Sequence, residues 1–235
     1  YAAADKQLLS VYRCPTSPKP LWCDSPPSVS GVPTQIMASS YVGISGAIPS
    51  STPGDVFDET RWNNGLGSTT QVRGGPVSGG GVLFIGGHTR IANIRDGTSS
   101  TLTISEQSNF LTLTDGSKVV WGGGSRHGWL IGCRRQQPPP NSGNGTDVRG
   151  FQLTSINYAV NQTSGWQVPV GSADCLTNRG VCSNFGNNIP LSSSHPGGVN
   201  AAYGDGSVRF LASSTPLPVL RRIATRDDGE VVADN

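Results

Sequence analysis

Charged residues are scarce in this chain of 235 residues, because Asp, Glu, Lys and Arg together make up 14% of it. The formal net charge is only +2, and the paired basic residues are confined to Arg134-Arg135 and Arg221-Arg222. Proteins that bind nucleic acids normally carry a larger basic cluster. We therefore expect no nucleic-acid partner.

Long apolar runs are also missing. No stretch approaches the ~20 apolar residues that a membrane-spanning helix needs, and no secretory signal peptide is recognisable. The chain begins at Tyr1 without an initiator methionine. We therefore expect a processed or trimmed piece of a longer protein.

The chain has five cysteines but no C-x-x-C pair, so the usual spacing of a structural zinc site is absent. Cys14 with Cys23, and Cys175 with Cys182, could each close a short local loop, whereas Cys133 would be left over. An oxidising, exported context favours such bridges. We predict at least one local disulfide, and the connectivity stays open at this point.

Glycine and proline are abundant, with 32 and 17 residues respectively, while 34% of the chain is hydrophobic. Glycine reaches about twice its ordinary share of roughly 7%. This composition favours strands, turns and long loops over a helical bundle. The predicted class is α+β, rich in strands.

The stretch 199–211 has the pattern of a β-hairpin. Asp205-Gly206 is predicted to supply the positive φ angles of a tight two-residue turn. His195-Pro196-Gly197-Gly198 forms a rigid bend before the first strand. The apolar residues that alternate on the two sides of the turn are Val199, Ala201, Tyr203, Val208 and Phe210.

Other segments also show strand or helix signals. In 98–106 the alternation predicts that Leu102 and Ile104 point inward. A helix is predicted to begin at Thr215 as the capping residue with Pro216 in its first turn. Its apolar face would consist of Leu217, Leu220 and Ile223/Ala224. Further strands are expected at 40–46, 82–85, 111–113, 119–121, 151–160 and 230–232.

Four segments, in chain order, resemble the DUF1559 family of prepilin-like proteins, which is typical of planctomycete bacteria. Tyr12–Pro18 is similar to a CPSDP-like segment, with Thr16 and Ser17 where Ser and Asp are usual. His195, nine residues and then Asp205-Gly206 reproduce the H-X9-DG signature. The other two segments are Asn93–Glu106, similar to DGTSNTL…GE, and Leu220–Val232, similar to LRALATRxGGEVV.

The resemblance implies a pilin- or pseudopilin-like fold, in which a helical spine packs against an antiparallel sheet with large Gly/Pro-rich loops. We expect one globular domain over 1–235, with the signature region at 192–232, and with the N-terminal helical spine absent or truncated. Membrane contact would then occur only through that missing helix. His195, Asp205 and Gly206 are expected to be structural residues.

The function implied by the resemblance is that of an extracellular structural subunit, not an enzyme. Such a subunit would assemble into a homo-oligomer or filament, or with type II secretion machinery or other cell-envelope partners. An apolar strip or sheet face should then be available for assembly. We assign this face to the apolar segments 82–85 and 119–121.

Two rival functions use other residues. A cell-surface module that binds carbohydrates or other ligands could use Trp22, Trp62 or Trp166 in the long loops. A hydrolase could use Ser194, His195 and Asp205, but adjacent residues do not establish triad geometry and no G-x-S-x-G elbow is present. We instead expect His195 to fix its bend by bonding to the backbone or to the Asp205 turn.

The candidate metal ligands are His195 with Asp205, or Asp96 with Glu106. Neither pair has the spacing of a known metal motif. We expect no cofactor, with structural calcium as the alternative, since type II pseudopilins can hold calcium near their C-terminal loops. No calcium ligand can be transferred to a residue of this sequence.

Overall fold

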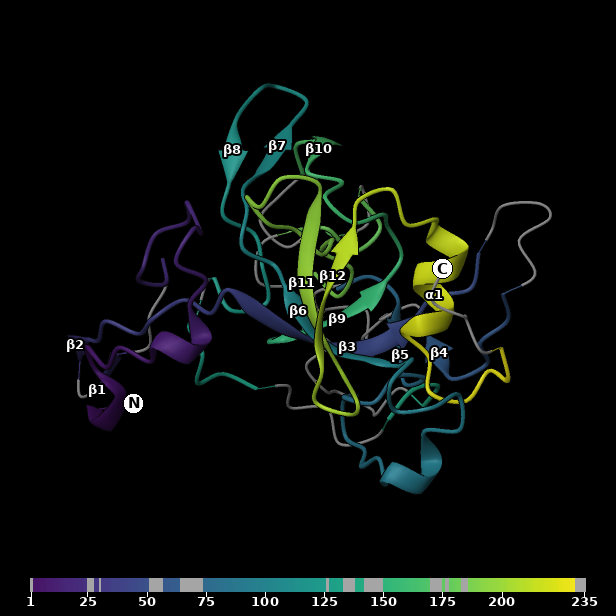
Figure 1. Ribbon diagram of the computed structural model, residues 1–235. Helices are drawn as coiled ribbons and strands as arrows, with labels where there is room; N and C mark the ends of the chain where they lie inside the picture. Colours follow the sequence, from purple (N-terminus) through teal and green to yellow (C-terminus); the bar gives the residue numbers. More distant parts are fainter. Residues whose placement is uncertain are drawn as a thin grey trace.

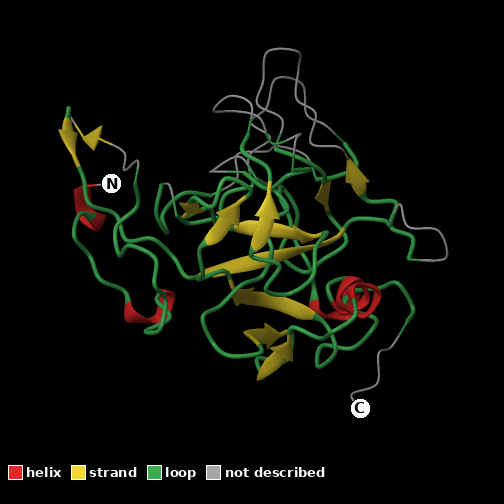
Figure 2. Cartoon of the chain, turned by 90° about the horizontal axis from the view of Figure 1, so that it is seen from above, coloured by secondary structure: helices red, strands yellow, loops and turns green. Residues whose placement is uncertain are grey.

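The computed structural model describes residues 2–24, 28–29, 31–50, 57–63, 74–125, 127–132, 138–141, 150–169, 175, 178–182 and 186–230. Across these ranges the chain folds into four β-sheets with one α-helix and three short 3₁₀ helices (Figures 1 and 2). The predicted β-rich α+β class is therefore confirmed. Within the same ranges, no helix is long and apolar enough to cross a membrane.

The largest sheet has five strands in the order β12-β11-β6-β3-β9. Neighbouring strands are antiparallel except for the edge strand β9, which runs parallel to β3. The expected antiparallel sheet is thus present with one parallel addition. Its strands are β3 (Tyr41–Ala47), β6 (Leu102–Glu106), β9 (Leu153–Ile156), β11 (Gly198–Tyr203) and β12 (Val208–Ala212).

Smaller elements surround this sheet. A three-stranded sheet has the order β10-β7-β8, and two further sheets are two-stranded ribbons, β1-β2 and β4-β5. The N-terminal region with β1 and β2 extends to one side of the main sheet (Figures 1 and 2). The bounds are β1 (Ser28–Val29), β2 (Val32–Pro33), β4 (Trp62–Asn63), β5 (Val77–Ser78), β7 (Leu111–Leu113), β8 (Lys118–Val119), β10 (Ser164–Trp166), η1 (Ala2–Ala4), η2 (Ser10–Tyr12) and η3 (Ile91–Asn93).

The main core lies between the five-stranded sheet and α1 (Leu217–Ile223). Leu220 and Ile223 are buried against the sheet and Leu217 packs beside them, which confirms the predicted apolar helix face. The start of the helix differs from the prediction, because Pro216 is the N-cap residue and no side chain caps the helix. We call the side of the sheet that packs on α1 the inner face, and the opposite side the outer face.

The predicted hairpin is confirmed, since β11 and β12 pair antiparallel from Gly198↔Ala212 to Ala202↔Val208. Its turn is longer than predicted. The Tyr203 N–H donates to the Ser207 carbonyl, so three residues form the loop, and among them Gly206 alone has a positive φ, of 84°. A type I turn followed by one left-handed residue joins strands in this way. Asp205 stabilises the loop by accepting hydrogen bonds from the Ser207 N–H and hydroxyl.

A β-bulge in β6 overturns the prediction that Leu102 and Ile104 both point inward. Ala202 pairs with Ile104 and Tyr203 pairs with Leu102, so Thr103 is an extra residue on the β6 side. An extra residue shifts the alternation of side chains between the two faces. Leu102 is buried in the main core, whereas Ile104 lies on the outer face and is 40% exposed.

Three other predicted strands need correction. Residues 82–85 form a bend, flanked by glycines, instead of a buried strand. The strand expected at 119–121 ends at Val119, and Val119 and Trp121 pack against a second core cluster around Leu111. Glu230 is not in a strand, and the rest of the strand expected at 230–232 lies outside the described residues. The assembly face predicted from 82–85 and 119–121 is therefore not a sheet face.

Candidate functional site

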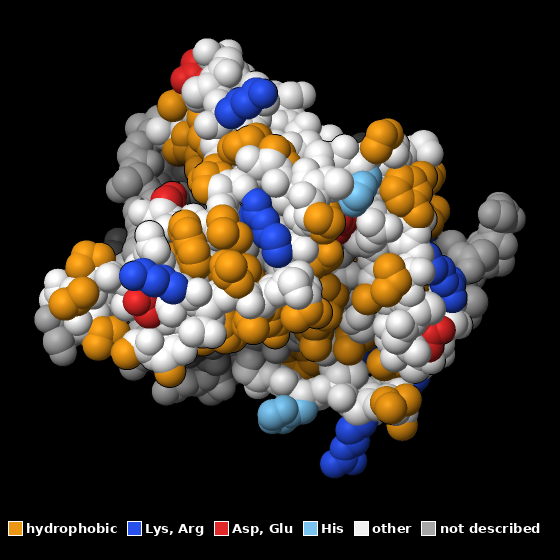
Figure 3. Space-filling view, turned by 60° about the vertical axis from the view of Figure 1, so that its left-hand side comes forward, with side chains coloured by type: hydrophobic (Ala, Val, Ile, Leu, Met, Phe, Trp, Pro, Cys, Tyr) orange, Lys and Arg blue, Asp and Glu red, His pale blue; other side chains and the backbone are white. Residues whose placement is uncertain are grey.

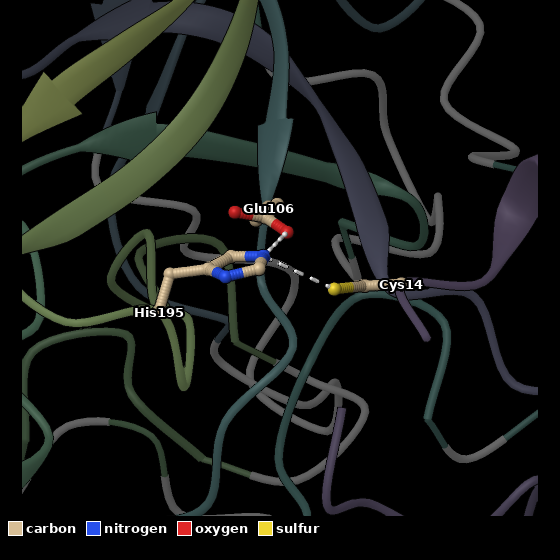
Figure 4. Close-up of side chains that lie close together, drawn as sticks. All are labelled: Cys14, Glu106 and His195. Atoms are coloured by element: carbon tan, nitrogen blue, oxygen red, sulfur yellow. Dashed lines mark hydrogen bonds and ion pairs between the residues drawn. The ribbon is translucent and has the colours of Figure 1, made fainter. Parts of the chain in front are cut away.

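Three side chains with metal-ligating or catalytic chemistry meet at one edge of the outer face (Figure 4). Glu106 is the last residue of β6, His195 lies in the bend before β11, and Cys14 lies in the N-terminal segment. The His195 Nε2 atom is 3.6 Å from the Cys14 Sγ atom and 3.4 Å from the Glu106 Oε1 atom. Both neighbours therefore approach the same nitrogen of the imidazole ring.

Strand register places Glu106 at this edge. Glu106 lies two residues after Ile104 in β6 and therefore shares the outer face with it, and the regular pairing of β6 with β11 places Asn200 on the same face. The Glu106 Oε2 atom accepts hydrogen bonds from the Asn200 N–H at 2.7 Å and from its side-chain amide at 3.4 Å. These bonds fix the carboxylate with Oε1 directed at His195 (Figure 4).

The His195 bend and the N-terminal segment hold each other in place. The Ser194 hydroxyl donates to the Thr16 carbonyl at 2.7 Å, and the His195 N–H donates to the Ser193 hydroxyl. The Thr16 hydroxyl is 3.2 Å from the Cys14 Sγ atom and 3.4 Å from the His195 Nε2 atom. Gly197 has a φ of 82°, which lets the chain turn sharply into β11.

Two basic residues fold the N-terminal segment into a loop. The Arg13 guanidinium donates to the carbonyls of Ser17, Lys19 and Pro20. The Lys19 ammonium is buried and donates to the carbonyls of Gln107 and Trp121 at 3.1 and 2.9 Å. Burial, followed by the nearby charge of Arg13, lowers the pKa of Lys19 to about 7. The segment that carries Cys14 is therefore anchored to the end of β6.

The residues considered for a hydrolase triad are not brought together. His195 precedes β11 and Asp205 follows it, so the six-residue strand separates them by about 20 Å. The Asp205 carboxylate bonds to Ser207 in the turn, and the Ser194 hydroxyl donates to a backbone carbonyl. His195 does not contact the Asp205 turn, which corrects that expectation.

The structure does not bring together either of the two candidate metal pairs, because the members of each pair have different partners. The Asp96 carboxylate accepts hydrogen bonds from the N–H groups of Asp228 and Gly229. Glu106 instead pairs with His195. Cys14 completes the cluster. Each of the three residues lies in a different one of the family-like segments, and the fold brings these segments together.

One of the two candidate disulfides is present. Cys175 and Cys182 are bonded, with their Cα atoms 5.2 Å apart. Cys14 has a free thiol that faces His195, so the Cys14–Cys23 bridge does not form. Cys133 lies outside the described residues.

A groove on the outer face borders the cluster. It has a volume of about 320 Å³, and its wall includes the rings of Tyr12 and Trp129, which stack with centroids 5.7 Å apart. None of the tryptophans considered for ligand binding lines it. Trp166 is buried against Tyr158, and Trp22 and Trp62 are half-buried elsewhere. The complete lining is Tyr12, Ser39, Tyr41, Val42, Gly43, Leu83, Ile104, Trp129, Gln152 and Leu153.

The comparison with known protein families matches residues 1–217 to the family described as "Protein of unknown function (DUF1559)". No curated protein and no solved structure matches the chain. The match covers the N-terminal segment, β6 and the His195 bend, and therefore all three residues of the cluster. Because it spans most of the sequence, the chain belongs to the DUF1559 family.

Proposed function

We propose that this protein is an extracellular structural subunit of the pilin or pseudopilin type. It assembles with copies of itself, as an oligomer or filament, or with secretion machinery. The outer face of the five-stranded sheet is the proposed assembly surface. This proposal replaces the segments 82–85 and 119–121 as the source of that surface.

The observation that carries the proposal is a row of small and apolar residues that crosses all five strands. Cross-strand pairing aligns Val208, Ala202, Ile104, Gly43 and Leu153 from β12 to β9. Each residue pairs with the next, so the row is continuous. It lies on the face that α1 does not cover.

Part of this row is exposed to solvent, since Ile104 is 40% exposed, whereas Gly43 is buried and Ala202 and Leu153 are half-buried. Val208 is 67% exposed and Phe210, two residues along β12, is 53% exposed. Hydrophobic side chains gather across the side of the molecule that faces away from α1, with Lys and Arg side chains between them (Figure 3). Exposed apolar patches that are contiguous and rimmed by polar groups are typical of interaction surfaces.

The edge position of β12 supports the same proposal. An edge strand presents unpaired backbone groups to other chains, and proteins commonly protect such edges with charge. The exposed side chains of β12 on the outer face are instead Val208 and Phe210. The Cys175–Cys182 disulfide agrees with an exported protein, because such bonds persist in oxidising compartments.

Self-association of the purified chain tests the proposal. We expect concentration-dependent oligomers by light scattering, and regular assemblies by negative-stain electron microscopy. Val208→Asp should raise the dimer dissociation constant at least about 10-fold, because a charge would be buried at the interface. Lys118→Asp, on the exposed β8, is the control and should leave association unchanged. A chain that stays monomeric at the highest soluble concentration would contradict the proposal.

A second candidate, a cell-surface carbohydrate-binding module, is favoured by the groove. Stacked aromatic rings beside polar groups suit the apolar faces and hydroxyls of sugars. The Tyr12–Trp129 pair lies beside Gln152 and Ser39, and the buried indole nitrogen of Trp129 has no hydrogen-bond partner among the described residues.

The two candidates are separable by variants on the same face. If the groove binds glycans, Trp129→Ala should abolish retention on a glycan array, whereas Val208→Asp should not. If the face serves assembly, Val208→Asp should weaken association and no glycan should be retained. Glycan binding that both variants leave intact would exclude the groove as the binding site.

A further inference from the structure

We infer that Cys14, Glu106 and His195 form a binding site for a divalent transition-metal ion, best suited to Zn²⁺. The three ligand atoms lie within 4.8 Å of one another, and they come from three segments far apart in the sequence (Figure 4). The site is independent of the assembly proposal, since it concerns the edge of the sheet and a different chemistry.

The distances match those around a tetrahedral ion. Zn–S bonds of about 2.3 Å and Zn–N or Zn–O bonds of about 2.0–2.1 Å place S and N about 3.5 Å apart, and N and O about 3.3 Å apart. The observed separations from His195 Nε2 are 3.6 Å to Cys14 Sγ and 3.4 Å to Glu106 Oε1. Two of the three separations thus already match a zinc site, and the third, between the thiol and the carboxylate, is no more than 4.8 Å and would shorten when the ion binds.

The distance of 3.4 Å between His195 Nε2 and Glu106 Oε1 is too long for a good hydrogen bond. A normal N–H···O bond is 2.7–3.2 Å long, so His195 does not satisfy Glu106 well. The Glu106 side chain is 1% exposed, and no described donor forms a hydrogen bond with its Oε1 atom. A buried carboxylate oxygen without a donor is costly. A metal ion would satisfy it.

The ligand types select the class of metal. Thiolate, imidazole and carboxylate together suit zinc and its neighbours, whereas calcium requires six to eight oxygen ligands. One thiolate and one carboxylate would neutralise a divalent ion. Thr16 is exposed and His195 is partly exposed, which leaves a path from solvent. The fourth position would be filled by water or by the adjacent Thr16 hydroxyl.

A nucleophilic cysteine is a poorer interpretation of the same residues. In a catalytic triad, the acid and the nucleophile contact opposite nitrogens of the histidine ring. Here Cys14 and Glu106 both face Nε2. The Cys14 side chain is also buried, at 1% exposure, which blocks access by a substrate. Three ligand atoms that face one another in this way are arranged as they would be around a shared metal ion.

A bound ion would fasten the N-terminal segment to the sheet. Cys14 belongs to that segment, whereas Glu106 and His195 belong to the sheet and its bend. Metal binding to a folded chain stabilises it in proportion to affinity and concentration. The ion would therefore hold in place Tyr12, which lines the neighbouring groove.

Titration of the chelator-treated, intact chain with Co²⁺ and Zn²⁺ tests the inference. We expect one Co²⁺ per chain, with the ligand-field bands of tetrahedral cobalt and a sulfur-to-cobalt charge-transfer band. Zn²⁺ should displace Co²⁺ and raise the melting temperature. Ca²⁺ should do neither. A cobalt spectrum without the sulfur band would overturn the site, and this result needs no variant.

Matched variants locate the ion. His195→Gln and Cys14→Ser should each weaken Zn²⁺ binding by at least about 100-fold, since each removes a direct ligand. His88→Gln replaces an exposed histidine outside the cluster and should bind as the wild type does. Unchanged binding in both ligand variants, or equal loss in His88→Gln, would overturn the site. Absence of stoichiometric binding to the wild type would do the same.

Discussion

The two faces of the five-stranded sheet differ in what covers them. The inner face is closed by α1, with Ile44, Val199 and Leu220 completely or almost completely buried. The outer face carries a comparable row of apolar side chains, but Val208 and Ile104 remain exposed. We therefore expect the closed core on the inner face to contribute most of the monomer's stability, whereas the outer face is the surface that we propose for contacts with partners.

A single inserted residue in β6 contributes to this difference. Thr103 bulges out of β6, and its hydroxyl donates to the Ala202 carbonyl at 3.0 Å. Without the bulge, strict alternation would place Leu102 on the same face as Ile104 and Glu106. Because of the bulge, the Leu102 side chain packs in the core, whereas the side chains of Ile104 and Glu106 lie on the outer face.

The largest expected change is a loss of folding stability that differs between substitutions on the two faces. Leu220→Ala should lower the free energy of unfolding by about 2–5 kcal/mol, because it leaves a cavity in the closed core. Ile104→Ala should lower it by less than about 1 kcal/mol, because the side chain is already partly in solvent. Urea denaturation of both variants measures the contrast. Equal losses would show that the outer face is as tightly packed as the inner one.

A smaller loss of stability is expected at two glycines, Gly43 within β3 and Gly81, which packs against β3. A Cβ atom on Gly81 would collide with the backbone of Ser45 and Gly46, so Gly81→Ala should cost about 1–3 kcal/mol or more. On Gly43, the Cβ atom would meet mainly the side-chain tips of Leu153 and Leu83, 2.7 and 3.2 Å away, which can move into the groove. Gly43→Ala should therefore cost less. Thermal melting of the two variants gives the comparison, and a larger loss in Gly43→Ala would contradict it.

The next prediction concerns the pH dependence of stability that arises from Lys19. This residue anchors the N-terminal segment that carries Cys14. Its pKa is lowered to about 7 by burial, so between pH 7 and about 10 the unfolded chain holds more protons than the folded chain. Stability from this group should rise with pH across that window, by up to about 1.4 kcal/mol per unit.

Lys19→Met provides the test of this pH dependence. The difference in unfolding free energy between wild type and variant should grow from pH 7 to pH 9 in favour of the wild type. Other titrating groups are common to both proteins and cancel. Parallel pH profiles would mean that the folded state does not lower the pKa of Lys19.

Much of the fold could be predicted from local signals. The alternation at 199–211 and the Asp205-Gly206 pair predicted the β11–β12 hairpin at the edge of the sheet, and the spacing of Leu217, Leu220 and Ile223 predicted the buried face of α1. These signals work because strand and helix periods are local properties of the chain. The bulge at Thr103 has no such signal, since the surrounding threonines fit either register.

The candidate site could not be predicted in the same way. The sequence offered His195 with Asp205 and Asp96 with Glu106 as candidate ligand pairs, although neither pair has the spacing of a known metal motif. The structure brings Cys14, Glu106 and His195 together through strand pairing and through the contacts of the N-terminal segment. Such long-range contacts depend on the packing of the whole chain.

Photo-crosslinking from the outer face tests most directly whether this face is an assembly surface. The substitution that it needs should also have the smallest effect on stability. A photo-crosslinking amino acid at Val208, which is exposed on β12, should leave the unfolding free energy within about 0.5 kcal/mol. Irradiation at concentrations where the chain associates should yield covalent dimers and larger species. The same amino acid at Lys118, exposed on β8, should yield few. Equal yields at the two positions, or monomer alone at Val208, would contradict the account.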